Sequence, residues 1–322
     1  MLKSLLGLAS PAGDGGRLST LIFHRVLAEP DPLFPQEVDR PRFDLICGWI
    51  RYWFNVLPLD EAAARLKERT LPPRAMAITF DDGYEDNASV ALPVLQRHGL
   101  PATFFVATGF LDGGRMWNDT VIEAIRRTAK ATLDLRDVSA GSFGSYDVAT
   151  AEAKRSAIGH ILLKAKYLPP AERQAFGETL ARLAGATLPT NLMMSTRQVR
   201  LLADSGMQVG AHTVSHPILA RLGDEQAYAE IERSKSFLEE RLDKPVTLFA
   251  YPNGKPGIDY GPAAVAGART AGFAAAMSTA WGAAGPDSEI FQLPRFTPWD
   301  RSRLRFGARL LANLRSRPVL SS

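Results

Sequence analysis

The segment A-I-T-F-D-D-G-Y, residues 77–84, indicates both the fold class and the place of the chemistry. An apolar run leads directly into two adjacent carboxylates and a glycine, as in a buried strand that ends in a polar turn. Barrels and open α/β sheets place their sites at the carboxyl ends of such strands. Asp81 and Asp82 are therefore candidate site residues, because one can bind a metal while the other accepts a proton. A plain turn closed by Gly83 is the alternative that this segment alone leaves open.

Short β-rich segments alternate with amphipathic helical patterns along the whole chain. The predicted strands are Leu18–Phe23, Phe54–Leu57, Ala75–Phe80, Ala102–Ala107, Met207–Ala211, Val246–Ala250, Phe273–Ser278 and Phe291–Phe296. Repeated alternation of this kind predicts an α/β fold with parallel strands joined by crossover helices, hence a barrel or a doubly wound sheet.

One stretch, from about residue 116 to residue 192, breaks this rhythm. It contains helix-like segments but no convincing strand, and G-S-F-G-S interrupts it at 141–145. We interpret it as a helical insertion in a main domain that covers residues 1–300. Without the insertion about 245 residues remain, a usual size for a single barrel.

A second candidate site segment is V-G-A-H-T-V-S-H-P, residues 209–217. His212 and His216 are four residues apart where a predicted strand ends, and Pro217 can start the next helix. Two imidazoles and one carboxylate form a three-ligand site with open positions, which suits zinc or another divalent metal that activates water. By itself an H-x-x-x-H pair is only a moderate signal, because Ser215 and His216 could simply cap a helix.

Other polar residues also lie at or near the ends of predicted strands. His24 comes after L-I-F, Asn253 lies in Y-P-N-G at 251–254, and Arg295 lies in L-P-R-F at 293–296. A lone histidine is more often a core or surface residue than a catalytic one, so the strand-end position is what makes His24 a candidate.

The composition is that of an ordinary globular protein, with 38 Lys+Arg, 34 Asp+Glu and 46% hydrophobic residues. A single cysteine excludes an intramolecular disulfide and a cysteine-rich metal site. Basic charge is concentrated after Asp300, where six arginines and no acids occur. The sequence pI of about 9.2 therefore reflects this tail and does not indicate a nucleic-acid-binding surface. Residues 301–322 form a basic amphipathic tail with Leu304, Leu310, Leu311 and Leu314 among the arginines. We expect either a helix that contacts a membrane surface or one that packs on the barrel by its leucines.

T-F-D-D-G-Y and H-T-V-S-H, with G-L-P-A-T-F-F-V at 99–106 and F-A-Y-P-N-G at 249–254, resemble the polysaccharide deacetylases of the NodB-homology type. The resemblance covers about residues 18–300 apart from the insertion. It implies a distorted (β/α) barrel of seven or eight strands that removes N-acetyl groups from amino sugars with one divalent metal. Zn²⁺ is the expected ion, with Co²⁺, Ni²⁺ and Fe²⁺ as alternatives. By motif position, Asp82, His212 and His216 are the implied metal ligands and Asp81 the implied general base.

The chain departs from the commonest pattern of that family in two places. Ala250 and Tyr251 occupy the region where an arginine is expected, and no histidine follows His216. L-I-F-H-R-V at 21–26 is similar to the start of the branch with a rearranged motif order, which acts on exported or lipid-linked polysaccharides. We therefore assign the acid role to His24 and the base-orienting arginine to Arg295. The backbone N–H of Asn253 is the expected donor to the oxyanion.

Two other functions remain open at this point. A deformylase or cyclic-amide hydrolase could use the same barrel and similar ligands. A binding protein with a degenerate site would hold glycan without cleaving it, but it should lack a ligand or the base, and this chain has all four. The predicted partner is an amino-sugar glycan, and the predicted location is cytoplasmic, with possible contact to the membrane surface through residues 301–322.

Overall fold

The computed structural model describes residues 2–138, 141–298 and 300–316. The chain divides into two compact units. The first comprises Met1–Ala28, Val38–Asp112 and Met194–Ser322, and the second comprises Glu29–Glu37 and Gly113–Met193. Each unit has a hydrophobic core of its own.

The first unit is built on a curled parallel sheet of seven strands. They are β1 (Leu18–Phe23), β2 (Asn55–Val56), β3 (Ala75–Phe80), β4 (Thr103–Val106), β7 (Gln208–Ala211), β8 (Leu248–Ala250) and β9 (Ala275–Met277). The order is β1-β3-β4-β7-β8-β9, and β2 pairs with the start of β3. β1 and β3 are buried along their whole length, because helices and loops cover both faces. This confirms the predicted α/β fold with a distorted barrel.

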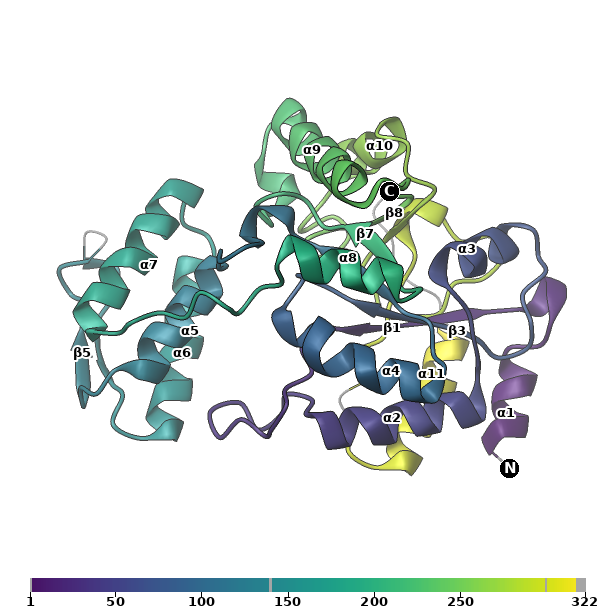
Figure 1. Cartoon of the computed structure of the whole chain (residues 1–322), viewed down its shortest axis with the longest axis horizontal. Coiled ribbons are helices and arrows are strands. Elements are labelled where there is room, and N and C mark those ends of the chain that lie inside the picture. Colours follow the sequence, from purple (N-terminus) through teal and green to yellow (C-terminus); the bar gives the residue numbers. More distant parts are fainter. Residues whose placement is uncertain (1, 139–140, 299, 317–322) are drawn as a thin grey trace. The chain divides into compact units, whose positions relative to one another are not determined.

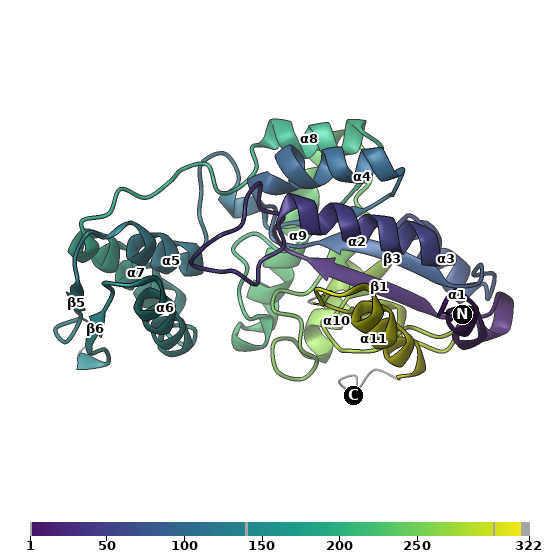
Figure 2. The same cartoon turned by 90° about the horizontal axis from the view of Figure 1, so that it is seen from below.

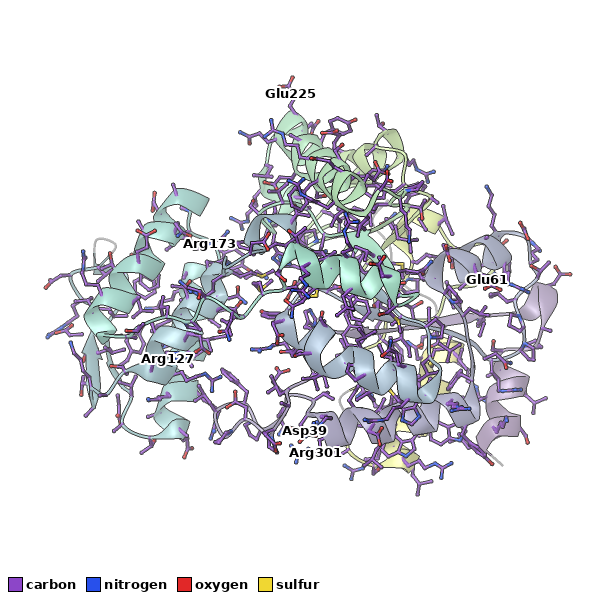
Figure 3. The ribbon with its side chains drawn as sticks, in the orientation of Figure 1. Asp39, Glu61, Arg127, Arg173, Glu225 and Arg301 are labelled. Carbon is purple, nitrogen blue, oxygen red and sulfur yellow. The ribbon has the colours of Figure 1, made fainter. Side chains whose placement is uncertain are left out.

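Helices surround this sheet (Figure 1). They are α1 (Leu2–Ala9), α2 (Arg40–Trp53), α3 (Leu59–Lys67), α4 (Leu92–His98), α8 (Thr196–Asp204), α9 (Asp224–Leu242), α10 (Pro262–Thr270) and α11 (Arg303–Arg315). Figure 2 shows α2, α4 and α8 side by side along the sheet, with α11 on the other side of β1 from α2. Asp39, labelled in Figure 3, caps α2 by accepting a hydrogen bond from the backbone N–H of Arg42 at 2.8 Å.

The prediction of an eighth strand over Phe291–Phe296 was wrong. The last residues of this segment instead connect β9 and β1, the two edge strands of the sheet. A 3₁₀ turn covers Ile290–Gln292. Leu293 then forms an isolated bridge to Met277 of β9, and Phe296 forms one to Leu21 of β1. Pro294 lies between them and has no N–H to donate, so a continuous ladder cannot form there.

The second unit contains helices α5 (Trp117–Arg127), α6 (Ala151–Ala165) and α7 (Pro170–Ala184). It also contains a short antiparallel pair, β5 (Thr132–Asp134) and β6 (Ser145–Asp147), so the expectation of a stretch without strands was wrong. Residues 29–37 join this unit: Asp31 accepts two hydrogen bonds from Arg126, and Leu33 is part of its core. Arg173, labelled in Figure 3, stacks over the Trp117 ring at 4.8 Å.

The basic tail forms helix α11, which packs against α1 and β1 as part of the first unit. Leu310 and Leu314 are fully buried and Leu311 packs on the core, whereas Leu304 is 80% exposed. The Ser19 hydroxyl donates to the Asn313 side chain at 3.0 Å. Of the two expectations for this segment, packing by the leucines accounts for most of its apolar face. Residues 317–322 lie outside the described part of the chain. Within that part, no helix is long and apolar enough to cross a membrane.

Candidate active site

The register of the parallel strands brings the predicted site segments to one edge of the sheet. Phe23 pairs with Phe80, so His24 and Asp81 occupy equivalent positions after β1 and β3. Val106 pairs with Ala211, and Ala211 pairs with Phe249. His212 therefore follows β7 beside the ends of β4 and β8. This edge is the carboxyl end of every strand, where parallel α/β folds hold their sites.

Asp81 and Arg295 form a buried ion pair, although 214 residues separate them in the sequence. The two guanidinium NH groups of Arg295 donate to the two carboxylate oxygens at 2.6 and 2.8 Å. Both residues are only 2% exposed, and the Arg295 Nε donates to the Ser278 carbonyl at 2.9 Å. Burial raises the pKa of Asp81, but the charges of Arg295 and His212 outweigh it and lower the pKa below its ordinary value. Asp81 is thus held as a carboxylate.

Asp82, His212 and His216 form a cluster whose ligand atoms all lie within 4.8 Å of one another. The Oδ1 atom of Asp82 is 3.5 Å from the Nε2 atom of His212 and 3.4 Å from that of His216. Tetrahedral zinc with bonds of about 2.1 Å separates its ligand atoms by roughly 3.4 Å. The donor set and its spacing therefore fit a single divalent ion.

Two further observations support this fit. The buried Oδ1 atom of Asp82 has no hydrogen-bond partner among the described residues, and such an orphaned acceptor is costly without a cation. The Nδ1–H of His212 donates to the Ala250 carbonyl at 2.7 Å. This bond fixes the tautomer and leaves Nε2 free to bind a metal, as is usual for metal-ligating histidines.

Burial and charge set the protonation states of the two imidazoles. Burial lowers the pKa of His216 to about 4, so its imidazole is neutral near pH 7. Burial also acts to lower the pKa of His212, but the nearby carboxylates of Asp81 and Asp82 outweigh it and raise that pKa. The surroundings therefore shift the pKa values of the two imidazoles in opposite directions.

The backbone of the site is unusual, because four of its non-glycine residues have positive φ. The values are 76° for Asp82, 64° for Thr213, 52° for His216 and 59° for Asn253. This conformation is uncommon, above all for a β-branched residue such as Thr213. Strained backbone of this kind persists only where the surroundings enforce it, and it clusters at functional sites.

His24 and Asn253 also lie at this edge, but with looser contacts than the residues above. His24 is exposed, and its charge acts on both Asp81 and Asp82 to lower their pKa values. The backbone N–H of Asn253 donates to no acceptor in the described part of the chain, while its carbonyl accepts from the Thr279 hydroxyl at 2.8 Å. Gly254 follows with a φ of 71°, and a Cβ there would lie 2.9 Å from the Thr279 side chain. Only glycine fits this turn.

The residues that form hydrogen bonds with the backbone of these segments were not predicted from the sequence. Asn87 donates from its side-chain amide to the His24 carbonyl at 2.9 Å, and Asp86 accepts from the Val26 N–H at 3.0 Å. Glu230, on α9, accepts hydrogen bonds from the loop between His212 and His216. Asp86 and Asn87 stand close to T-F-D-D-G-Y, which is a usable signal, whereas nothing in the sequence marks Glu230.

Comparisons with known proteins agree with this geometry. The family described as Polysaccharide deacetylase matches residues 68–135 and 178–276. YxkH of Bacillus subtilis (strain 168), named for the same family, is 21% identical over 281 residues, which cover 87% of this chain and 70% of that protein. Among solved structures, the Streptococcus pyogenes deacetylase PplD has a TM-score of 0.61 and 17% identity, with 93% of this chain and 99% of that one covered. IcaB from Ammonifex degensii has a TM-score of 0.59 and 20% identity, with 95% and 99% covered. The chain therefore belongs to the polysaccharide deacetylase family, and it is a hydrolase of that family.

Proposed function

We propose that this enzyme uses one divalent metal to remove N-acetyl groups from amino sugars of a polysaccharide or lipid-linked glycan. The observation that carries the proposal is the cluster of Asp82, His212 and His216 beside the buried Asp81–Arg295 pair. The cluster has the donors and spacing of a metal site, and the pair supplies a carboxylate that stays ionised. A degenerate binding protein would have no use for both.

Asp82, His212 and His216 would hold the metal, with Zn²⁺ as the first choice and Co²⁺, Ni²⁺ or Fe²⁺ as alternatives. Bound there, the metal would supply Lewis-acid chemistry: it polarises an amide carbonyl and makes water acidic enough to lose a proton near neutral pH. Two imidazoles and one carboxylate leave positions open for water and substrate.

The protein's own residues divide the proton transfers between them. Asp81 accepts the proton of the attacking water, and Arg295 holds this carboxylate in place through two parallel hydrogen bonds. The backbone N–H of Asn253 donates to the oxyanion that develops on the amide. His24 then protonates the departing amine, because an amide nitrogen is a poor leaving group without a proton.

The test is a release assay on N-acetyl and N-formyl amino-sugar oligomers, run on purified enzyme freed of metal and then loaded with zinc or cobalt. We expect acetate to be released only by the loaded enzyme, at one metal per chain, and His212→Ala to lose both metal and activity. Release of formate alone would change the assignment to a deformylase. Stoichiometric binding of an intact glycan with no product from any substrate would identify a non-catalytic protein.

A further inference from the structure

The loop that leads from His212 to His216, residues 213–216, has a strained backbone. Contacts with the surrounding structure must therefore stabilise its conformation. Thr213 and His216 both have positive φ. Such residues cost of order 1–3 kcal/mol each and need surroundings that enforce them. Within the loop, the Thr213 hydroxyl accepts from the His216 N–H at 3.1 Å and donates to the His212 carbonyl at 2.5 Å. These local bonds connect the two histidines but do not tie them to the rest of the barrel.

Glu230 provides the connection to the rest of the unit. Its Oε2 atom accepts from the backbone N–H groups of Val214 at 2.9 Å and Ser215 at 2.8 Å. Its Oε1 atom accepts from the Ser215 hydroxyl at 2.7 Å. Bonds to an ionised carboxylate are roughly twice as strong as bonds between neutral groups. Three of them from one side chain therefore fix the middle of the loop.

The helix that carries Glu230 is a rigid support. α9 spans 19 residues and buries Ile231, Ser234 and Leu238 among others. It packs against α10 and β7, the strand from which the histidine loop emerges. A carboxylate on this helix thus holds the loop at a fixed position relative to the strand.

The opposite side of the loop is held by the turn after β4. The Thr108 N–H donates to the Thr213 carbonyl at 3.1 Å, and the Gly109 N–H donates to the Val214 carbonyl at 2.9 Å. A Cβ at position 109 would lie 2.7 Å from that carbonyl oxygen, so the approach requires glycine. The loop is therefore fixed between this turn and Glu230.

We propose that Glu230 is a positioning residue of the metal site, which holds residues 213–216 so that the His216 imidazole faces Asp82. This inference rests on the proposed function, because it assumes that His212, His216 and Asp82 bind a metal. Groups behind metal ligands typically change metal affinity by about 10–100-fold when they are removed. Glu230 touches neither ligand side chain, so its effect must pass through the backbone of the loop.

The experiment is a cobalt and zinc titration of the full-length protein and five variants, read by visible absorption of Co²⁺ and by calorimetry. Glu230→Ala removes all three bonds, and Glu230→Gln keeps one oxygen that can accept from both backbone N–H groups. Ser215→Ala removes only the hydroxyl bond. Glu232→Gln is the matched control, because Glu232 lies on the same helix but bonds only to Ser236 in the described structure.

We expect Glu230→Ala to weaken metal binding about 10–100-fold and to alter the Co²⁺ spectrum. Glu230→Gln should restore most of the affinity, Ser215→Ala should lose little, and Glu232→Gln should match the native protein. Native affinity and spectrum in a folded Glu230→Ala variant would overturn the inference, as would an equal loss in Glu232→Gln. His212→Ala separates the two proposals. If it loses metal while Glu230→Ala does not, only the positioning role fails, and if it binds metal normally, the metal site itself is wrong.

Discussion

The loop after β3 and the loop after β7 lie at the same end of the sheet, with β4 between their strands, yet they are held by different forces. Asp81 in the first loop is fixed by a buried ion pair with Arg295. His216 in the second loop is fixed by hydrogen bonds to its backbone and to the backbone of its neighbours. Both loops contain residues with positive φ, so both need outside support. The loop after β3 is supported by the charge of Arg295. The loop after β7 is supported by hydrogen bonds to its backbone, which place no charge beside the His216 imidazole.

This difference matches the protonation state that each side chain needs in the proposed mechanism. A general base must be ionised, and the charge of Arg295 keeps the pKa of Asp81 low although burial would raise it. A histidine ligand must be neutral, and burial lowers the pKa of His216 to about 4. Each loop therefore prepares its residue before any metal or substrate binds, and each can be altered separately.

The largest expected effect separates the two aspartates of the first loop. Asp81→Asn should lower kcat by about 10⁴-fold with metal still bound, because asparagine keeps the shape but cannot accept the proton. Asp82→Asn should abolish activity together with metal binding. Turnover with a loaded metal and metal content per chain are the two measurements. Equal metal loss in both variants would mean that the two carboxylates share or exchange their roles.

The next effect concerns His24, the proposed acid at the end of β1. His24→Ala should lower kcat on an N-acetyl sugar by about 10²–10⁴-fold, because the departing amine then lacks a proton donor. Metal content should not change, and an activated ester, whose leaving group needs no proton, should be hydrolysed nearly as fast as by the native enzyme. Amide turnover at the native rate in this variant would remove His24 from the mechanism.

A third prediction addresses the charge that holds the first loop. In the native protein the ionised Asp81 contributes stability that is fully present at pH values above its ordinary pKa of 3.8. This contribution is lost as the pH falls through the lowered pKa of the folded state. In Arg295→Met, we expect burial to outweigh the remaining charges and to raise the pKa of Asp81. The acidic limb of the kcat/KM profile should therefore move to higher pH, and the free energy of unfolding should fall by about 3–5 kcal/mol.

The control for that variant is Arg65→Met, which breaks an exposed pair with Glu61 on α3. An exposed pair contributes about 0–1 kcal/mol, so the control should barely change stability and should leave the pH profile alone. An unmoved acidic limb in Arg295→Met would show that Asp81 does not depend on Arg295 for its ionisation.

The smallest expected effect concerns α11 and the proposed location, which is cytoplasmic with contact to a membrane surface. Leu310 and Leu314 are buried, so removing the helix would damage the barrel, and substitutions at its exposed positions are the better test. Arg305→Gln/Arg315→Gln should weaken salt-sensitive binding to anionic vesicles by roughly 2 kcal/mol, since each basic residue near the surface contributes about 1 kcal/mol. Equal co-sedimentation of both proteins, or none by either, would leave α11 with a packing role only.

Much of this protein could be predicted from local sequence. Continuous apolar runs marked the main strands, because a strand buried on both faces needs no polar residue until it ends. T-F-D-D-G-Y and H-T-V-S-H could be recognised because the proposed metal ligation requires particular side chains at short, fixed spacings. The family and the barrel followed from these segments. The short β5–β6 pair was not predicted, because three-residue strands carry almost no periodic signal.

Other features were decided only by the tertiary structure. Arg295 was expected to orient the base, but its contact with Asp81 arises because residues 293–296 bridge β9 to β1 through isolated pairs instead of the predicted strand. Glu230 reaches the histidine loop only because α9 packs beside β7. The leucines of α11 looked equally suited to lipid and to protein, and only the position of the helix against α1 and β1 directed most of them inward. The sequence thus determined the chemistry of the site, because that depends on residue types at short range, while the supports of the site depend on which distant surfaces meet when the chain folds.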